Sequence, residues 1–70
     1  MASMNDTIRY IEAHGAKAFI NWLPEPRDGI VATIEGLAEF SDGSSHWETI
    51  TRVPTDCEVS TGDVRAWLNY

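Results

Sequence analysis

The sequence has little of what most catalytic or metal sites require. Cys57 is the only cysteine among 70 residues, so the chain cannot form an internal disulfide. His14 and His46 stand far apart and are too few to build a zinc site with one cysteine. A phosphate-binding glycine loop, a nucleophile motif and a calcium-loop spacing are all absent from the sequence. We therefore expect no catalytic residue, no metal and no cofactor.

Positive charge and long apolar runs are also scarce. Five Lys and Arg stand against eleven Asp and Glu, which gives a net charge of −6. Direct nucleic-acid binding is therefore not expected, because it needs clustered cations, and the charge favours basic partners instead. No apolar run approaches the roughly 20 residues that span a bilayer, and the first residues do not resemble a signal peptide. With its lone thiol, the chain is predicted to be cytoplasmic and to bind no membrane.

The residues that are present predict one small domain. An apolar fraction of 43% with three tryptophans can supply a compact core, to which we assign Trp22, Trp47 and Trp67. We expect residues 1–5 to be a disordered start, its first three residues added ahead of Met4, and residues 6–70 to form the domain. Cys57 is interpreted as a half-buried small residue.

Local patterns place the elements of this domain. Helical spacing predicts a helix over 6–14 that begins at the caps Asn5 and Asp6 and ends before Gly15. Residues 16–23 fit either a continued helix or a strand, and the strand is preferred because Gly15 interrupts the helix. A turn over 24–29 leads to alternating strands over 29–40 and 46–53.

The remaining signals complete the fold. Asp42-Gly43 predicts a two-residue hairpin turn between the second and third strands. Ser60 and Asp63 form a capping pattern before Val64, so the last ten residues are predicted to be a helix. The expected fold is therefore α+β, a three-stranded antiparallel meander with terminal helices in the order α-β-β-β-α.

The hairpin turn sets a register, and the register sets a candidate surface. A two-residue turn places Trp47 opposite Ala38 and Thr51 opposite Ile34 on an apolar inner face. On the outer face, the expected pairs are Glu39 with His46, Leu37 with Glu48, Glu35 with Ile50 and Thr33 with Arg52. We predict that a partner binds the acidic and apolar side chains of this outer face: Glu35, Leu37, Glu39, Glu48 and Ile50. The alternative is a solvated face with cross-strand ion pairs.

Three segments resemble a known class of proteins. Residues 38–44, 47–50 and 64–70 are similar to parts of small acidic proteins of phages and prophages, in particular type I anti-CRISPR proteins. The resemblance implies an inhibitor that acts in a bacterial host, and we expect this inhibitor to be non-enzymatic, cytoplasmic and monomeric. Such an inhibitor would mimic DNA and occupy the basic, nucleic-acid-binding surface of a type I CRISPR surveillance complex, so blocking DNA recognition. The alternative is a small phage or bacterial accessory domain that binds other proteins or itself.

Overall fold

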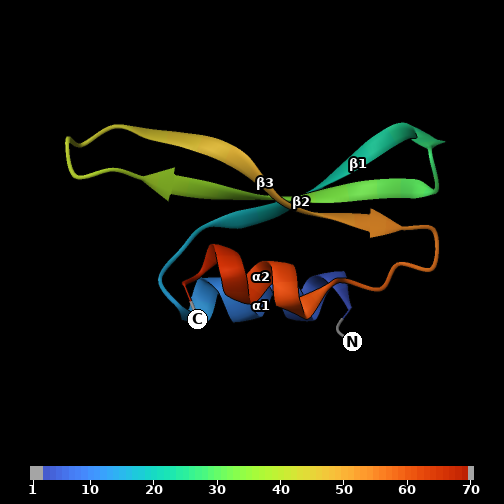
Figure 1. Cartoon of the computed structure of the whole chain (residues 1–70), viewed down its shortest axis with the longest axis horizontal. Coiled ribbons are helices and arrows are strands. Elements are labelled where there is room, and N and C mark those ends of the chain that lie inside the picture. Colours follow the sequence, from blue (N-terminus) through green and yellow to red (C-terminus); the bar gives the residue numbers. More distant parts are fainter. Residues whose placement is uncertain (1–2, 70) are drawn as a thin grey trace.

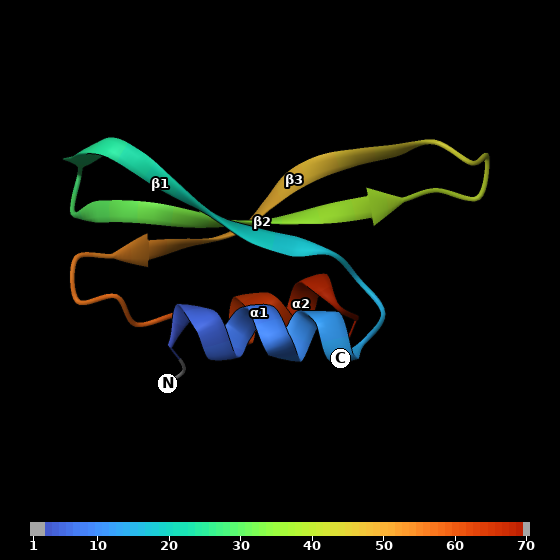
Figure 2. The same cartoon turned by 180° about the vertical axis from the view of Figure 1, so that it is seen from behind.

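The computed structural model describes residues 3–69, which fold into two layers. The elements are α1 (Met4–Ala13), β1 (Ala18–Arg27), β2 (Ile30–Glu39), β3 (Ser45–Pro54) and α2 (Thr61–Trp67). The three strands form an antiparallel meander in the order β1-β2-β3. Both helices lie side by side against one face of the sheet, and no described element covers the other face (Figure 1, Figure 2). This architecture confirms the predicted α+β fold. The first two residues of the expected disordered start, and Tyr70, lie outside the described residues.

Helix α1 begins earlier than the sequence predicts. Ser3 is its N-cap, and the Ser3 Oγ accepts a hydrogen bond from the Asp6 N–H at 3.2 Å. Residues 4–5 are therefore helical rather than a disordered start. The same Ser-x-x-Asp spacing caps α2, where the Ser60 Oγ accepts from the Asp63 N–H at 3.4 Å, as predicted. Both helices thus begin at the same short sequence pattern.

The end of α1 decides the structure of the next segment. Gly15 has a φ of +84°, and its N–H bonds the Glu12 carbonyl at 2.9 Å, while the Ala16 N–H bonds the Ile11 carbonyl at 3.4 Å. Together these bonds form a Schellman motif, which stops a helix and turns the chain. The chain then enters β1, so the prediction of a strand in 16–23 is confirmed from Ala18 onward, and the alternative of one long helix is wrong.

Strand β1 extends further than expected, through both prolines of the predicted turn over 24–29. The ladder to β2 is interrupted between Trp22 and Arg27, where these prolines lie. Proline lacks an N–H and is tolerated in a sheet only at an edge, which β1 provides. Only Asp28 and Gly29 form the turn, with φ values of 54° and 76°. Two positive φ values are typical of a type I′ hairpin turn.

The hairpin between β2 and β3 has a three-residue loop, not the two-residue turn that the sequence predicts. The Phe40 N–H bonds the Ser44 carbonyl at 2.9 Å, which closes the loop over 41–43. Gly43 alone in this loop has a positive φ, of +89°. The Asp42 Oδ1 accepts from the Ser44 Oγ at 2.6 Å and from the Ser44 N–H at 2.9 Å. Both bonds lower the pKa of Asp42 below its usual value of 3.8, and the bond from the Ser44 hydroxyl has the larger effect.

The extra loop residue shifts the pairing near the hairpin end. Leu37 lies opposite Trp47 instead of Glu48, and Ala38 lies opposite His46. A shift of one residue turns every side chain of a strand to the other face. The predicted pairs in this half of the hairpin are therefore wrong, and Trp47 points away from the helices.

A β-bulge at Ile50 restores the predicted register. Glu35 lies opposite Thr49, yet the next residue of β2, Ile34, lies opposite Thr51 as expected. Ile50 is the extra residue on β3, so it and Thr51 both face the helices. The shifts at the loop and at the bulge therefore cancel. The part of β3 before Ile50 is one residue out of the predicted register, and Thr51 and Arg52 after it pair as predicted.

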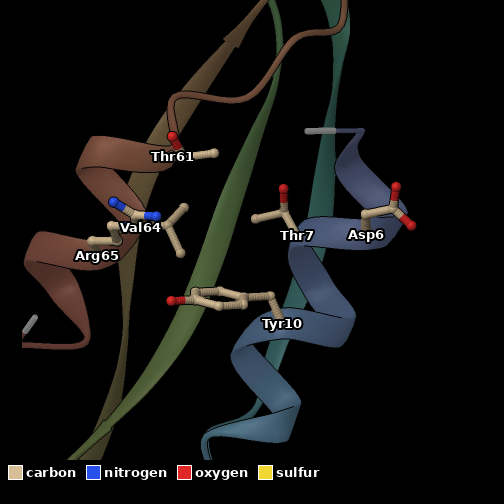
Figure 3. A pocket seen from close by; sticks show the side chains of 6 residues that line it. All are labelled: Asp6, Thr7, Tyr10, Thr61, Val64 and Arg65. Carbon is tan, nitrogen blue, oxygen red and sulfur yellow. The ribbon is translucent and has the colours of Figure 1, made fainter. Parts of the chain in front are cut away.

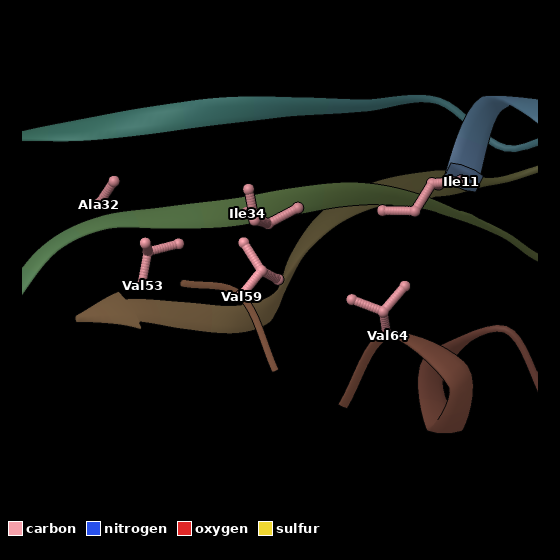
Figure 4. Packing of buried hydrophobic residues seen from close by; sticks show 6 residues of the cluster. All are labelled: Ile11, Ala32, Ile34, Val53, Val59 and Val64. Atoms are coloured by element: carbon pink, nitrogen blue, oxygen red, sulfur yellow. The ribbon is translucent and has the colours of Figure 1, made fainter. Parts of the chain in front are cut away.

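The core lies between the sheet and the two helices. Its fully buried apolar residues are Ile11, Ala32, Ile34, Val53, Val59 and Val64 (Figure 4). Of the three tryptophans predicted to be buried, Trp67 packs against this cluster. Trp22 and Trp47 are wrongly predicted, since 57% and 49% of their surfaces are exposed. Cys57 is also exposed rather than half-buried.

Candidate functional site

The candidate site is the face of the sheet that the helices leave uncovered. Because directly paired residues share a face, the ladders assign its members. This open face comprises Phe19, Asn21, Thr33, Glu35, Leu37, Glu39, Ser45, Trp47, Thr49 and Arg52. At its centre, one row runs across all three strands from Phe19 through Glu35 to Thr49. Leu37 and Trp47 form the adjacent row.

Two exposed aromatic rings meet at the centre of the open face. Phe19 on β1 and Trp47 on β3 have ring centroids 4.9 Å apart and planes at 78°, an edge-to-face contact. The two strands are separated by β2, so these side chains reach across the middle strand. Phe19 is 44% exposed and Trp47 is 49% exposed. Large aromatic side chains in such a position are typical anchors of protein interfaces. We call Phe19 and Trp47 the aromatic pair.

Glu35 lies between Phe19 and Thr49 in the central row of the open face, and its carboxylate is unusual. Its Oε1 accepts a hydrogen bond from the Thr49 Oγ1 at 3.2 Å. Its Oε2 is shielded from solvent and has no hydrogen-bond partner among the described residues. A carboxylate oxygen in this state loses hydration without compensation, which costs stability.

Replacing Glu35 by methionine is expected to stabilise the protein. The substitution keeps the length of the side chain and removes the shielded, unpartnered oxygen, which should raise the free energy of unfolding by about 1 kcal/mol. In a domain of this size, that corresponds to a rise in Tm of about 4–8 °C, measured by thermal unfolding followed by circular dichroism.

Glu39→Met is the matched control for this prediction, because Glu39 lies on the same strand and face but is exposed. Its free energy of unfolding should stay within about 0.5 kcal/mol of the parent's value. A Glu35→Met protein that melts at or below the parent's Tm would show that the Glu35 carboxylate is adequately solvated.

The structure divides the five residues predicted to contact a partner. Glu35, Leu37 and Glu39 lie on the open face, whereas Glu48 and Ile50 face the helices. The three-residue loop and the bulge cause this division. The expectation that three glutamates share one face is therefore wrong.

Glu48 instead links the sheet to α2. Its Oε1 accepts a hydrogen bond from the Trp67 Nε1–H at 2.6 Å, and its Oε2 lies 3.2 Å from the His46 Nε2. Reversing the charge of Glu48 would remove the acceptor for the indole. A charge reversal at Glu48 would therefore disturb the packing of α2, whereas a charge reversal at the exposed Glu39 changes only the surface.

Both members of the aromatic pair were missed as site residues by sequence reasoning. The alternation that places Ala18 and Ile20 on the inner face also places Phe19 on the outer one, so this signal was present in the sequence. No comparable signal exists for Trp47, because its face depends on the length of the loop.

A hollow lies between the two helices and is a second candidate site (Figure 3). It is a hollow of about 250 Å³ lined by Asp6, Thr7, Tyr10, Thr61, Val64 and Arg65. The Thr7 hydroxyl already donates to the Ser3 carbonyl at 2.8 Å, and Asp6 lies 4.0 Å from Arg9. Small-molecule sites are usually larger, about 300–1,000 Å³. The open face therefore remains the stronger candidate.

Three further observations complete the description of the site. Within residues 3–69, no three His, Cys, Asp or Glu side chains come together in a group that could hold a metal ion. No helix in this part of the chain has the length and apolar character needed to cross a membrane. Comparisons with known protein families, with curated proteins and with solved structures found no match to the chain.

Proposed function

We propose that the chain is a non-enzymatic protein-interaction domain that binds its partner through the open face of the sheet. The observation that carries this proposal is the aromatic pair, which is exposed at the centre of the uncovered face. Interfaces of this kind use a few aromatic anchors within a polar rim. Asn21, Thr33 and Thr49 supply such a rim here.

The charge of the chain narrows the class of partner. A net charge of −6 attracts a basic surface and speeds association with it. Basic surfaces are typical of proteins that bind nucleic acids. In the narrower form of the proposal, which the resemblance to anti-CRISPR proteins suggests, the chain acts in the bacterial cytoplasm. There it would occupy the DNA-binding surface of a type I CRISPR surveillance complex.

The proposal predicts that the aromatic pair is required for binding. The parent, Phe19→Ala/Trp47→Ala and Trp22→Ala are immobilised and exposed to the same bacterial lysate. Proteins retained by the parent are expected to be retained at least about tenfold less by the double variant, because two interface anchors are lost. Trp22→Ala is the control, since it removes a tryptophan of similar exposure from the opposite face. Retention that is unchanged in the double variant would contradict the proposal.

The narrower form has its own test with a purified type I surveillance complex and its target duplex. The parent is expected to weaken DNA binding in a mobility-shift assay, and this effect should decrease as salt is raised. Failure of the parent to bind the complex would remove the inhibitor hypothesis but leave the interaction domain. A dimer in sedimentation analysis that the double variant abolishes would instead assign the open face to self-association.

A further inference from the structure

The shielded carboxylate of Glu35 indicates what the open face receives. Among the described residues, no arginine, lysine or histidine forms an ion pair with Glu35. Within residues 3–69, the one hydrogen bond to Glu35 comes from the neutral Thr49 hydroxyl, and Oε2 accepts none. A shielded carboxylate without a charged partner is stabilised when a cation forms an ion pair with it. In the part of the chain that the structure describes, the Glu35 carboxylate therefore has a neutral donor and no cationic side chain as its partner.

The aromatic pair adds a second preference for positive charge. Phe19 is directly opposite Glu35 in the ladder, and Trp47 is opposite Leu37, the next residue of β2 on the same face. Aromatic ring faces attract cations, and the indole of tryptophan does so most strongly. A carboxylate beside two aromatic rings therefore combines two independent features that bind a cation.

We propose that the open face receives an arginine side chain of the partner, whose guanidinium contacts the Glu35 carboxylate and stacks on the aromatic pair. This inference rests on the proposed function, that the open face binds a protein. Arginine fits better than lysine because a guanidinium is planar, weakly hydrated and able to bond a carboxylate through two N–H groups. The acidic chain provides the long-range attraction.

Entry of the guanidinium requires a movement of side chains only. The Glu35 Oε2 is shielded in the free protein, so a neighbouring side chain must turn aside. Both rings are nearly half exposed, and exposed side chains change rotamer rapidly. Interfaces commonly show such rotamer changes while the backbone stays fixed.

The test uses short peptides as probes. An acetylated, amidated Gly-Arg-Gly peptide is titrated into ¹⁵N-labelled protein, and the indole N–H signal of Trp47 is followed by NMR. The same titration is repeated with two peptides in which citrulline or lysine replaces the arginine. Citrulline has nearly the shape of arginine but no charge. We expect the arginine peptide to shift the Trp47 signal saturably. The citrulline peptide should bind at least about tenfold more weakly, and the lysine peptide should fall between the two.

Two single substitutions locate the charge. Glu35→Gln should weaken binding of the arginine peptide about tenfold, whereas Glu39→Gln should change it less than twofold. Both remove one negative charge from the same face of β2, so the change in net charge is the same. Thermal melts establish that both variants are folded.

The outcomes separate this inference from the proposed function. Equal binding of the arginine and citrulline peptides, or equal losses in the two variants, would overturn the arginine site. The open face would then still be the interface if Phe19→Ala/Trp47→Ala loses the captured partner. Arginine-dependent shifts confined to signals outside the open face would also overturn the inference.

Discussion

Replacing Trp67 by alanine is expected to lower the free energy of unfolding by about 3–5 kcal/mol. The indole packs against the buried cluster and lies over Gly36 of β2. It also donates its Nε1–H to the Glu48 carboxylate at 2.6 Å, so the substitution leaves that acceptor without its partner. The buried cluster contains only six apolar residues within the described chain, so few other contacts can compensate. Urea unfolding followed by fluorescence or circular dichroism measures the change.

Trp67→Phe separates the two contributions. Phenylalanine retains most of the apolar contact with Gly36 but cannot donate to Glu48. We expect it to cost about 1–2 kcal/mol, clearly less than alanine. If Trp67→Ala melts within a degree or two of the parent, the ring does not hold α2 on the sheet, and the packing described above is not important for stability.

The order and type of the elements could be predicted because local signals decide them. Gly15 stops α1 whatever its tertiary surroundings, and Ser60 with Asp63 starts α2. Alternation along β2 reflects a strand with one buried face. The prolines of β1 were misleading, because an edge strand tolerates residues that a central strand would reject.

The register of β3 could not be predicted from the same signals. Asp42-Gly43 fits a two-residue turn, but Asp42 instead bonds Ser44 and the loop takes a third residue. The bulge at Ile50 then reverses the shift. Neither irregularity has a strong sequence signature. The residues of β3 between the loop and the bulge therefore point to the opposite face from the predicted one. The prediction therefore held for Thr51 and failed for Trp47.

This inversion explains why the predicted site was only partly correct. The prediction that Glu48 and Ile50 lie on the outer face depends on the register alone. In the observed register both residues face the helices. Trp47, which is predicted to face the helices, instead lies on the open face and is its largest exposed side chain. Glu35 stayed on that face, because Phe19 and Thr49 flank it in the ladders. Its role changed from one of several surface charges to a shielded carboxylate beside aromatic rings.

Replacing Gly36 by alanine is expected to cost about 1–3 kcal/mol in the parent, the usual cost of overpacking a core. A Cβ at this position would lie 2.8 Å from two ring atoms of Trp67 and 2.5 Å from the Ile50 Cδ1. The end of the isoleucine side chain can turn aside, but the indole is rigid and held by its bond to Glu48. Gly36 is therefore needed for space, since its backbone has no positive φ.

A double-mutant cycle distinguishes this steric role from a backbone role. In the Trp67→Ala background the ring is absent, so Gly36→Ala should be neutral or stabilising by a few tenths of a kcal/mol, because alanine orders a strand at less entropic cost than glycine. The coupling energy between the two positions should then be about 1–3 kcal/mol, within the range seen for residues in contact. Equal costs of Gly36→Ala in both backgrounds would show that the indole does not limit the space at Gly36. In that case α2 would be positioned on the sheet by Val64 and by the bond between Thr51 and Asp63, whose oxygens lie 2.9 Å apart.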